Sequence, residues 1–377
     1  MAIQKYDVIV VGVGGMGSAT VYQLAKRGKK VLGIEQFQIA HELGSSHGLS
    51  RIIRLAYHEG PEYVAFGKRA YELWGTLQAE MGEKILHITG SVHAGLPESS
   101  GFQNTLGACI DQNIPHQIFT SSELHKKFPG YQLPEDMMAV FQEDGGFLVP
   151  EKCIEGHVKL ATQWGAQIHE GERVIHWEPV DSGVKIITDQ AEYYADALVF
   201  TAGAWAGKLI PELESIAVPE RQVVAWFEPS NIEMFSPANF PVFIITSDEE
   251  EYYGFPAFGV PGYKVGKFHH VGEISDPDNL DRDLRQEDEE MLRSFTRNHF
   301  PAAEGKMLSM VVCMFTNSPD HNFVIGLHQE YPQVSYAAGF SGHGFKFCST
   351  VGEVMADLAE YRESSNDISI FSPSRFH

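Results

Sequence analysis

Three glycines and an acid near the start of the chain have the spacing of a dinucleotide-binding turn. Gly12, Gly14 and Gly17 directly follow the apolar run 8–11, and Glu35 ends a second apolar run at roughly the ~20-residue distance expected of a ribose-binding acid. In such a turn the glycines permit the tight bend, the approach of a pyrophosphate to the backbone, and close packing of helix on strand. A glycine-rich turn in another α/β protein is the alternative. The strand before the turn and the helix after it favour dinucleotide binding.

Four cationic residues stand in sequence contexts that predict a role in binding or stabilising an anion. Arg51 and Arg54 lie three residues apart in a polar arm, and a helix there would place both guanidinium groups on one face. Lys346 follows the glycine-rich turn 339–344 at the start of a predicted helix, where a cation is electrostatically unfavourable. A residue that breaks a local rule in this way indicates a functional site. Lys264 lies between aromatic residues in a predicted strand, and an ordinary surface lysine is the alternative for both lysines.

The cysteines show no pattern of their own. Cys109, Cys153, Cys313 and Cys348 are widely scattered, with neither the paired spacing of a metal site nor a secreted disulfide framework. This usage predicts no metal and a reducing, cytoplasmic location. Cys313 follows an apolar run, where a cysteine is usually an inert buried side chain.

Composition excludes several classes of partner. The chain has 377 residues and a formal net charge of −22, so it offers no basic stripe to nucleic acid or to an anionic membrane surface. We find no apolar run near the ~20 residues that span a bilayer. The first apolar run is interpreted as a strand and not as a signal peptide, because the glycine turn follows it at once.

Periodicity predicts an α/β protein of two lobes. Buried strands at 8–11, 31–34 and 197–201 belong to a Rossmann-like lobe, whereas long alternating aromatic strands from about residue 220 predict an inserted antiparallel sheet. One strand is expected over 85–92, and helices are expected from Pro150 to before Gly165 and over 287–299. The predicted nucleotide-binding lobe is discontinuous and comprises residues 1–82, 145–217 and 318–377. The predicted substrate lobe comprises residues 83–144 and 218–317.

Seven segments together resemble one known family. They are GVGGMG at 12–17, GSSHGLSRIIRLAY at 44–57, TAGAW at 201–205, YYGFPAFG at 252–259, YKVGK at 263–267, CMFTNSPDHNFVI at 313–325 and GFSGHGFKF at 339–347. The chain resembles the monomeric sarcosine oxidase and N-methyl-amino-acid oxidase family, flavoproteins of the glycine-oxidase and D-amino-acid-oxidase type. The resemblance spans essentially the whole chain and implies FAD, which the glycine turn alone cannot distinguish from NAD.

The resemblance also implies roles for individual residues. Cys313 matches the cysteine that is joined covalently to the flavin, and Arg54 with Lys346 match the pair that binds the substrate carboxylate. Lys264 matches the lysine that activates oxygen, and Arg51 is expected near the flavin edge. The residues predicted to contact the cofactor are Gly12, Gly14, Gly15, Met16, Gly17, Glu35, Ser45, Arg51, Val174, Gly203, Cys313, Gly342, His343, Gly344 and Lys346.

The chain departs from the family's sarcosine oxidases at two predicted pocket positions. Phe315 stands where they carry a tyrosine, and Phe268 stands where they carry a histidine, with His269 and His270 just beyond. Alternation along the strand would put His270, and not His269, on the face of Lys264 unless a bulge intervenes. Tyr253 is retained as an expected pocket wall. We therefore count Tyr253, His269 and His270 with Lys264 and Arg51 as candidate catalytic residues, and Phe315 as a substrate contact.

The predicted function is oxidation of a secondary α-amino acid such as sarcosine to an imine, which hydrolyses, with O₂ reduced to H₂O₂. The more apolar pocket leaves larger N-alkyl, cyclic or glycated amino acids as substrates, so a fructosyl-amino-acid oxidase is one alternative. A flavin dehydrogenase with another electron acceptor and a non-catalytic nucleotide-binding protein are the others. The protein is expected to act as a monomer.

Overall fold

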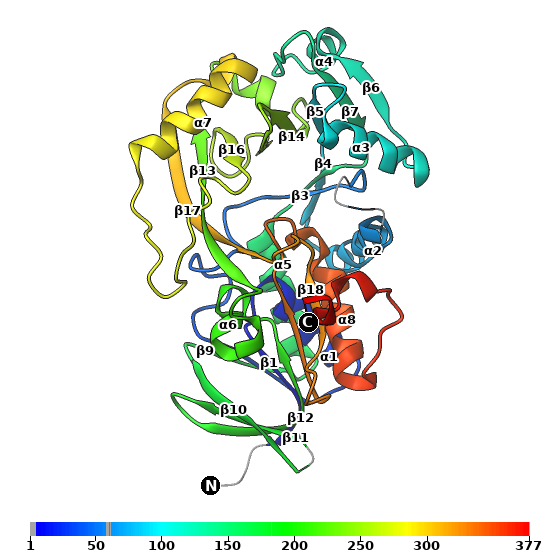
Figure 1. The fold of residues 1–377 in the computed structure, drawn as a ribbon, viewed down its shortest axis with the longest axis vertical. Coiled ribbons are helices and arrows are strands. Elements are labelled where there is room, and N and C mark those ends of the chain that lie inside the picture. The colour runs from blue at the N-terminus through cyan, green and yellow to red at the C-terminus, as the bar shows by residue number, and fades with distance from the viewer. Residues whose placement is uncertain (1–4, 58–59, 61, 182, 377) are drawn as a thin grey trace.

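The computed structural model describes residues 5–57, 60, 62–181 and 183–376. The elements form two groups, one around a sheet near the N-terminus and one around a second sheet at the far end of the long axis (Figure 1). Within the described residues, no helix combines the length and the apolar character needed to cross a bilayer.

The first sheet is built on a parallel core. Its strands β9, β2, β1, β12 and β19 run parallel, β18 pairs antiparallel with β19, and the β10–β11 hairpin continues from β12. The bounds are β1 Lys5–Val11, β2 Val31–Glu35, β9 Gln167–Glu170, β10 Val174–Val180, β11 Gly183–Thr188, β12 Glu192–Phe200, β18 Val324–Leu327 and β19 Val334–Ala338. Val10 pairs with Gly33 on one side and Val199 on the other, so β1 is central. Its near-continuous apolar sequence is explained by burial on both faces.

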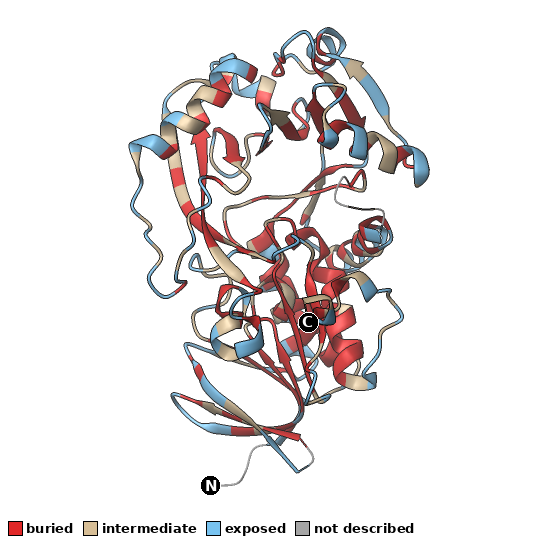
Figure 2. Ribbon diagram, in the orientation of Figure 1, coloured by how far each residue is buried: buried red, intermediate tan, exposed pale blue. Residues whose placement is uncertain are grey.

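Four helices pack together beside this sheet. They are α1 Gly15–Lys26, α2 Glu62–Met81, α5 Pro150–Gln163 and α8 Cys348–Tyr361, and α1 contacts both α5 and α8. Their inward sides are buried and join one apolar core with the strands (Figure 2). The short helix α6, Ala206–Leu209, belongs to a second apolar cluster, which includes Ile210 and residues of β10–β12.

The second sheet has the strand order β17–β13–β16–β15–β14–β5–β7–β6. Its bounds are β5 Ser91–Gly95, β6 Gln117–Thr120, β7 Met138–Gln142, β13 Val218–Phe227, β14 Val242–Ser247, β15 Glu250–Phe255, β16 Tyr263–Lys267 and β17 Met307–Asn317. All neighbours are antiparallel except β14 and β5, which run parallel. Helix α7, Gln286–His299, packs against β13 and β16, while α3 Ser100–Asp111 and α4 Ser121–Lys127 contact β7 at the other end.

A small third sheet settles the conformation of the arm at Arg51 and corrects the strand predicted over 85–92. It joins β3 Arg51–Ile53, β8 Gly146–Leu148 and β4 Leu86–Ile88. The arm at Arg51 is a strand because it pairs with β8, so the helical arrangement considered for Arg51 and Arg54 does not occur. The single strand predicted over 85–92 is wrong. Gly90, at φ +79°, divides it into β4 and β5, which belong to different sheets.

The predicted fold class is confirmed: a mixed α/β protein with a Rossmann-like sheet and a separate, mainly antiparallel sheet. Strands from 91–142 and from 218–317 share the second sheet. The residue bounds of the two lobes stay a prediction.

Candidate active site

A cavity of about 590 Å³ lies between the two sheets. Most of the predicted site residues line it: Gly12, Gly14, Gly15, Met16, Glu35, Ser45, Arg51, Arg54, Val174, Gly203, Tyr253, Lys264, Cys313, Phe315, Gly342, His343, Gly344 and Lys346. Gly17, His269 and His270 are described by the structure and lie outside this wall. Segments far apart in the sequence therefore share one cavity.

The glycine turn has the shape that a dinucleotide requires. Gly12 has φ +88°, and a Cβ there would lie 2.6 Å from the carbonyl oxygen of Thr201. A Cβ on Gly17 would lie 1.8 Å from the carbonyl oxygen of Gly12, so Gly17 permits the helix–strand contact without lining the cavity. On the cavity side, Gly14 is followed by α1, whose N-terminus has no side-chain cap among the residues that the structure describes. Free N–H groups at a helix N-terminus bind phosphate, so this end of the cavity fits FAD.

Glu35 fixes the same turn. Its carboxylate accepts hydrogen bonds from the backbone N–H of Val13 at 2.9 Å and of Phe37 at 3.1 Å. The side chain is buried and lines the cavity. An ionised carboxylate has about four acceptor sites, so these two bonds leave it able to accept a ribose hydroxyl.

Arg54 and Lys346 meet at one tyrosine ring. The Arg54 guanidinium lies 4.6 Å and the Lys346 ammonium 4.9 Å from the centroid of Tyr57, and both cations are at least nine-tenths buried. Lys346 donates to the carbonyl oxygen of His343 at 2.8 Å and to the Tyr57 hydroxyl at 3.2 Å. Arg54 donates to the carbonyl oxygen of Ala56. Two cations held this closely can bind one carboxylate.

Lys264 and Arg51 lie on another part of the wall. Lys264 is 1% exposed, and its ammonium lies 4.4 Å from the centroid of Phe255. Burial, reinforced by the charge of Arg51, holds the pKa of Lys264 well below its usual range. Arg51 is anchored through bonds to the carbonyl oxygens of Ser50 at 2.9 Å and Ser45 at 2.8 Å.

Cys313 lies in β17 opposite Gln222 of β13. Burial raises the pKa of its thiol, while the nearby charges of Arg51 and Lys264 act in the opposite direction. Phe315, two residues on, packs against the glycine-rich turn 339–344, since a Cβ on Gly342 would lie 2.3 Å from its ring. The arrangement places an apolar ring beside the thiol in the same wall.

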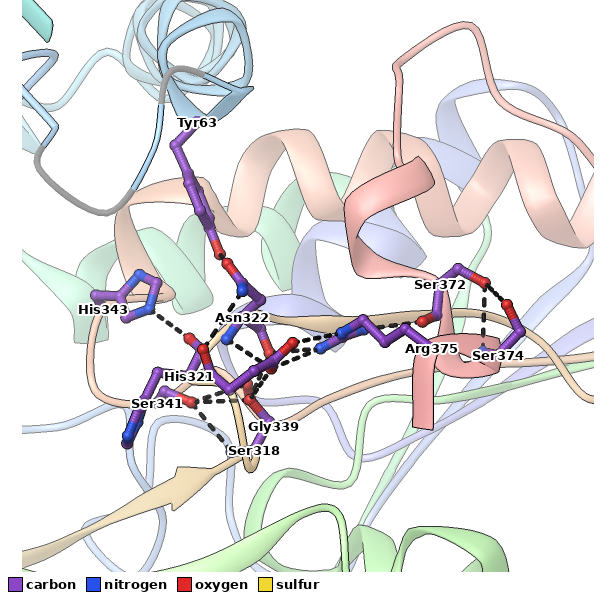
Figure 3. A network of polar contacts seen from close by, with 11 residues as sticks. Tyr63, Ser318, His321, Asn322, Gly339, Ser341, His343, Ser372, Ser374 and Arg375 are labelled. Atoms are coloured by element: carbon purple, nitrogen blue, oxygen red, sulfur yellow. Dashed lines mark hydrogen bonds and ion pairs between the residues drawn. The ribbon is translucent and has the colours of Figure 1, made fainter. Parts of the chain in front are cut away.

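A polar network surrounds the 318–322 turn and reaches the glycine-rich loop 339–344 (Figure 3). Ser318 donates to the carbonyl oxygen of Asn322 at 2.6 Å, and Asp320 pairs with Arg375 at 2.7 Å. The Nε2 of His343 lies 3.0 Å from the carbonyl oxygen of His321, which joins this turn to the glycine-rich loop. These contacts fix the glycine-rich loop, whose Gly342 lines the cavity together with Lys346.

The alternation predicted for His269 and His270 is wrong. Strand β16 ends at Lys267, and both histidines have positive φ angles, 55° and 37°. His270 turns away to Asp288, with Nε2 2.7 Å from its Oδ1, and His269 lies 3.2 Å from Glu220. Phe268 is the residue of this segment that lines the cavity.

Comparison with known proteins identifies the family. Residues 7–358 match DAO, the FAD dependent oxidoreductase family. The chain belongs to this family.

Individual members and related folds agree with that membership. The chain is 42% identical to monomeric sarcosine oxidase of Bacillus sp. (strain NS-129), over 98% of this chain and 97% of that protein. It is 36% identical to N-methyl-L-tryptophan oxidase of Yersinia pestis (strain Pestoides F), over 98% and 99%. The fold matches that of NikD, an unusual amino acid oxidase, at a TM-score of 0.85 and 23% identity over 98% of each chain. It also matches L-proline dehydrogenase from P. horikoshii at 0.86 and 22% identity, over 99% of this chain and 98% of that one.

Several residues of the cavity wall are not among the site residues predicted from the sequence. His47, Ile244, Phe255 and Thr316 all line the cavity. Phe255 has a detectable signal, because it lies two residues after Tyr253 in a strand and so shares its face. The other three belong to segments whose placement depends on tertiary contacts.

Proposed function

We propose that the protein is an FAD-dependent oxidase of N-methyl and other secondary α-amino acids. It would convert the substrate to an imine, which hydrolyses, and reduce O₂ to H₂O₂. The observation that carries the proposal is the convergence of Arg54 and Lys346 on Tyr57 in the wall of the cavity that begins at the glycine turn. The relatives named as sarcosine and N-methyl-L-tryptophan oxidases support this substrate class over a fructosyl amino acid or a dehydrogenase.

The residues of the cavity wall would have different roles in this reaction. Bound FAD would supply the two-electron acceptor for the C–N bond and the donor for oxygen. Arg54 and Lys346 would bind the carboxylate and so orient the reacting carbon, which is catalysis by positioning. Lys264 would stabilise the negative charge that develops on oxygen as it is reduced. Tyr253 and Phe315 would form the wall around the substrate, which Phe315 makes more apolar than a tyrosine would.

We also propose a covalent thioether bond between Cys313 and the flavin, for which the thiol S–H and a C–H bond of the flavin would break and the two electrons released would pass through the flavin to O₂. It is supported by the position of the thiol in the cavity wall near Arg51 and Lys264, and by the match of this segment to the family's motif. A monomer in the reducing cytoplasm is proposed as well. The four cysteines, all within the described residues, are buried and free, in keeping with such a compartment.

The carboxylate site is tested with Arg54→Gln. Charge-assisted hydrogen bonds of this kind contribute about 1.5–3 kcal/mol, so we expect kcat/KM for N-methyl amino acids to fall roughly 10- to 100-fold. Peroxide production is measured over sarcosine, larger N-methyl, cyclic and glycated amino acids. Each is paired with an amine of the same structure that lacks the carboxylate.

Arg69→Gln serves as the matched control, because Arg69 pairs with Glu353 and Glu72 and lies outside the cavity wall described here. We expect it to behave as the wild type. If Arg54→Gln lowered activity equally on the amino acids and on the amines without a carboxylate, Arg54 would have no role in carboxylate binding.

A further inference from the structure

The turn that precedes β3 has an unusual backbone. Gly48 and the next residue, Leu49, both have positive φ angles, 100° and 69°. A non-glycine residue is strained in this conformation, so contacts elsewhere must hold Leu49 in place. The N–H of Ser50 closes the turn by donating to the carbonyl oxygen of Gly48 at 2.9 Å.

Glu151 holds this turn from the side of α5. Its Oε1 accepts hydrogen bonds from the backbone N–H of Gly48 at 2.7 Å and of Leu49 at 3.0 Å. Bonds to an ionised acceptor are stronger than those between neutral groups. The second oxygen, Oε2, is buried and has no hydrogen-bond partner among the described residues. The hydrogen bonds of the Glu151 carboxylate therefore hold the turn at Gly48 and Leu49.

Lys264 contacts the same turn from the second sheet. Its ammonium donates to the carbonyl oxygen of Gly48 at 2.6 Å, to the carbonyl oxygen of Ser50 at 3.1 Å and to the Ser50 hydroxyl at 3.1 Å. All three acceptors thus belong to residues at the turn that Glu151 fixes. A change in the turn would move the acceptors of Lys264 together.

We propose that Glu151 is a positioning residue for Lys264, acting through the Gly48–Ser50 turn. This inference rests on the proposed role of Lys264 in oxygen reduction. The titratable and charged groups that act on Lys264 or are acted on by it are Arg51, Cys313, His47 and Glu151. Burial and then Arg51 lower the pKa of Lys264, whereas the charges of Cys313 and Glu151 oppose that shift. Glu151 therefore also favours the charged form of the lysine.

The test separates the two half-reactions in the FAD-loaded protein by stopped flow. Glu151→Ala removes both backbone contacts, while Glu151→Gln keeps an acceptor oxygen and removes the charge. We expect reoxidation by oxygen to slow roughly 10-fold in Glu151→Ala and less in Glu151→Gln, with reduction by substrate changed less than about 2-fold. In a Lys264→Met background the Glu151 substitutions should cause no further slowing, because coupled residues are not additive.

A second readout needs no flavin. In the full-length chain before FAD is added, the pH dependence of acetylation of Lys264 by acetic anhydride is followed by mass spectrometry. We expect Glu151→Gln to shift the midpoint to lower pH. Glu155→Gln is the matched control, since Glu155 is an exposed acid of the same helix, and its midpoint should follow the wild type.

The outcomes distinguish the two proposals. Equal slowing of both half-reactions, persistence of the Glu151 effect in the Lys264→Met background, or an unchanged labelling midpoint would each overturn the role of Glu151. If Lys264→Met itself left reoxidation unchanged, the oxygen role of Lys264 would be wrong. The labelling midpoint would then still decide whether the charge of Glu151 acts on the lysine.

Discussion

Cys313 shows how a residue's surroundings decide its chemistry. Burial raises the pKa of its thiol, and a buried cysteine of this kind is usually inert. Four cations, Arg51, Lys264, Arg282 and Arg221, act against that shift. Cys348, also in the cavity wall, has a thiol pKa raised well above its usual range by burial. Arg51 and Lys346 also oppose the shift at Cys348, so the surroundings of the two cysteines differ in degree, with more cations acting on Cys313.

Replacing Cys313 tests the proposed flavin bond. We expect acid-precipitated wild-type protein to retain flavin fluorescence and the Cys313→Ser pellet to lose it, because the serine cannot form the thioether. Cys348→Ser is the control and should keep the fluorescence. A bright Cys313→Ser pellet, or a dark wild-type one, would contradict the assignment.

Helices and turns were predictable from the sequence where residues close along the chain determine them. The glycine turn with α1, the helix opened by Pro150 and the helix near 287–299 all follow from local signals, and the structure confirms them. The arm at Arg51 was not predictable in this way. It is a strand because it pairs with β8, and Glu151 and Gln142, which lie far along the chain, bond its backbone. His269 and His270 were misplaced for a similar reason, since Asp288 and Glu220 hold them after β16 has ended.

The packing of α5 against α1 and α2 predicts a pH effect on stability. His157 of α5 is 2% exposed, its ring packs on Trp74 and Tyr22, and burial lowers its pKa to about 3. Between that value and the ordinary value of about 6.5, the unfolded chain binds a proton that the folded protein does not. The neutral, buried His157 ring therefore makes its full contribution to the free energy of unfolding above pH ~6.5. That contribution is lost as the pH falls below this value.

His157→Gln removes this titration. Denaturant unfolding between pH 6.5 and 4 should show a free energy of unfolding that falls less steeply in the variant, by about 1.4 kcal/mol per pH unit. Other groups titrate in this range, so the difference between variant and wild type is the quantity to compare. Parallel curves for the two proteins would show that His157 does not contribute.

At the scale of the whole molecule, the cavity depends on contacts that join distant segments. Cys313 and Lys264 come from the second sheet, Gly14 from the turn between β1 and α1, and Arg54 from the arm that contains β3. The types of these residues and their family motifs were readable in the sequence. The residues that orient them, such as Tyr57 and Glu151, were not, because their partners are brought together only by the fold.

The most direct test is to mix the FAD-loaded protein anaerobically with an N-methyl amino acid and then admit oxygen. We expect the visible flavin band to bleach on mixing and to return with oxygen, with H₂O₂ formed in an amount equal to the substrate consumed. A flavin band that no secondary amino acid bleaches, or one that returns only with an acceptor other than oxygen, would contradict the proposed oxidase.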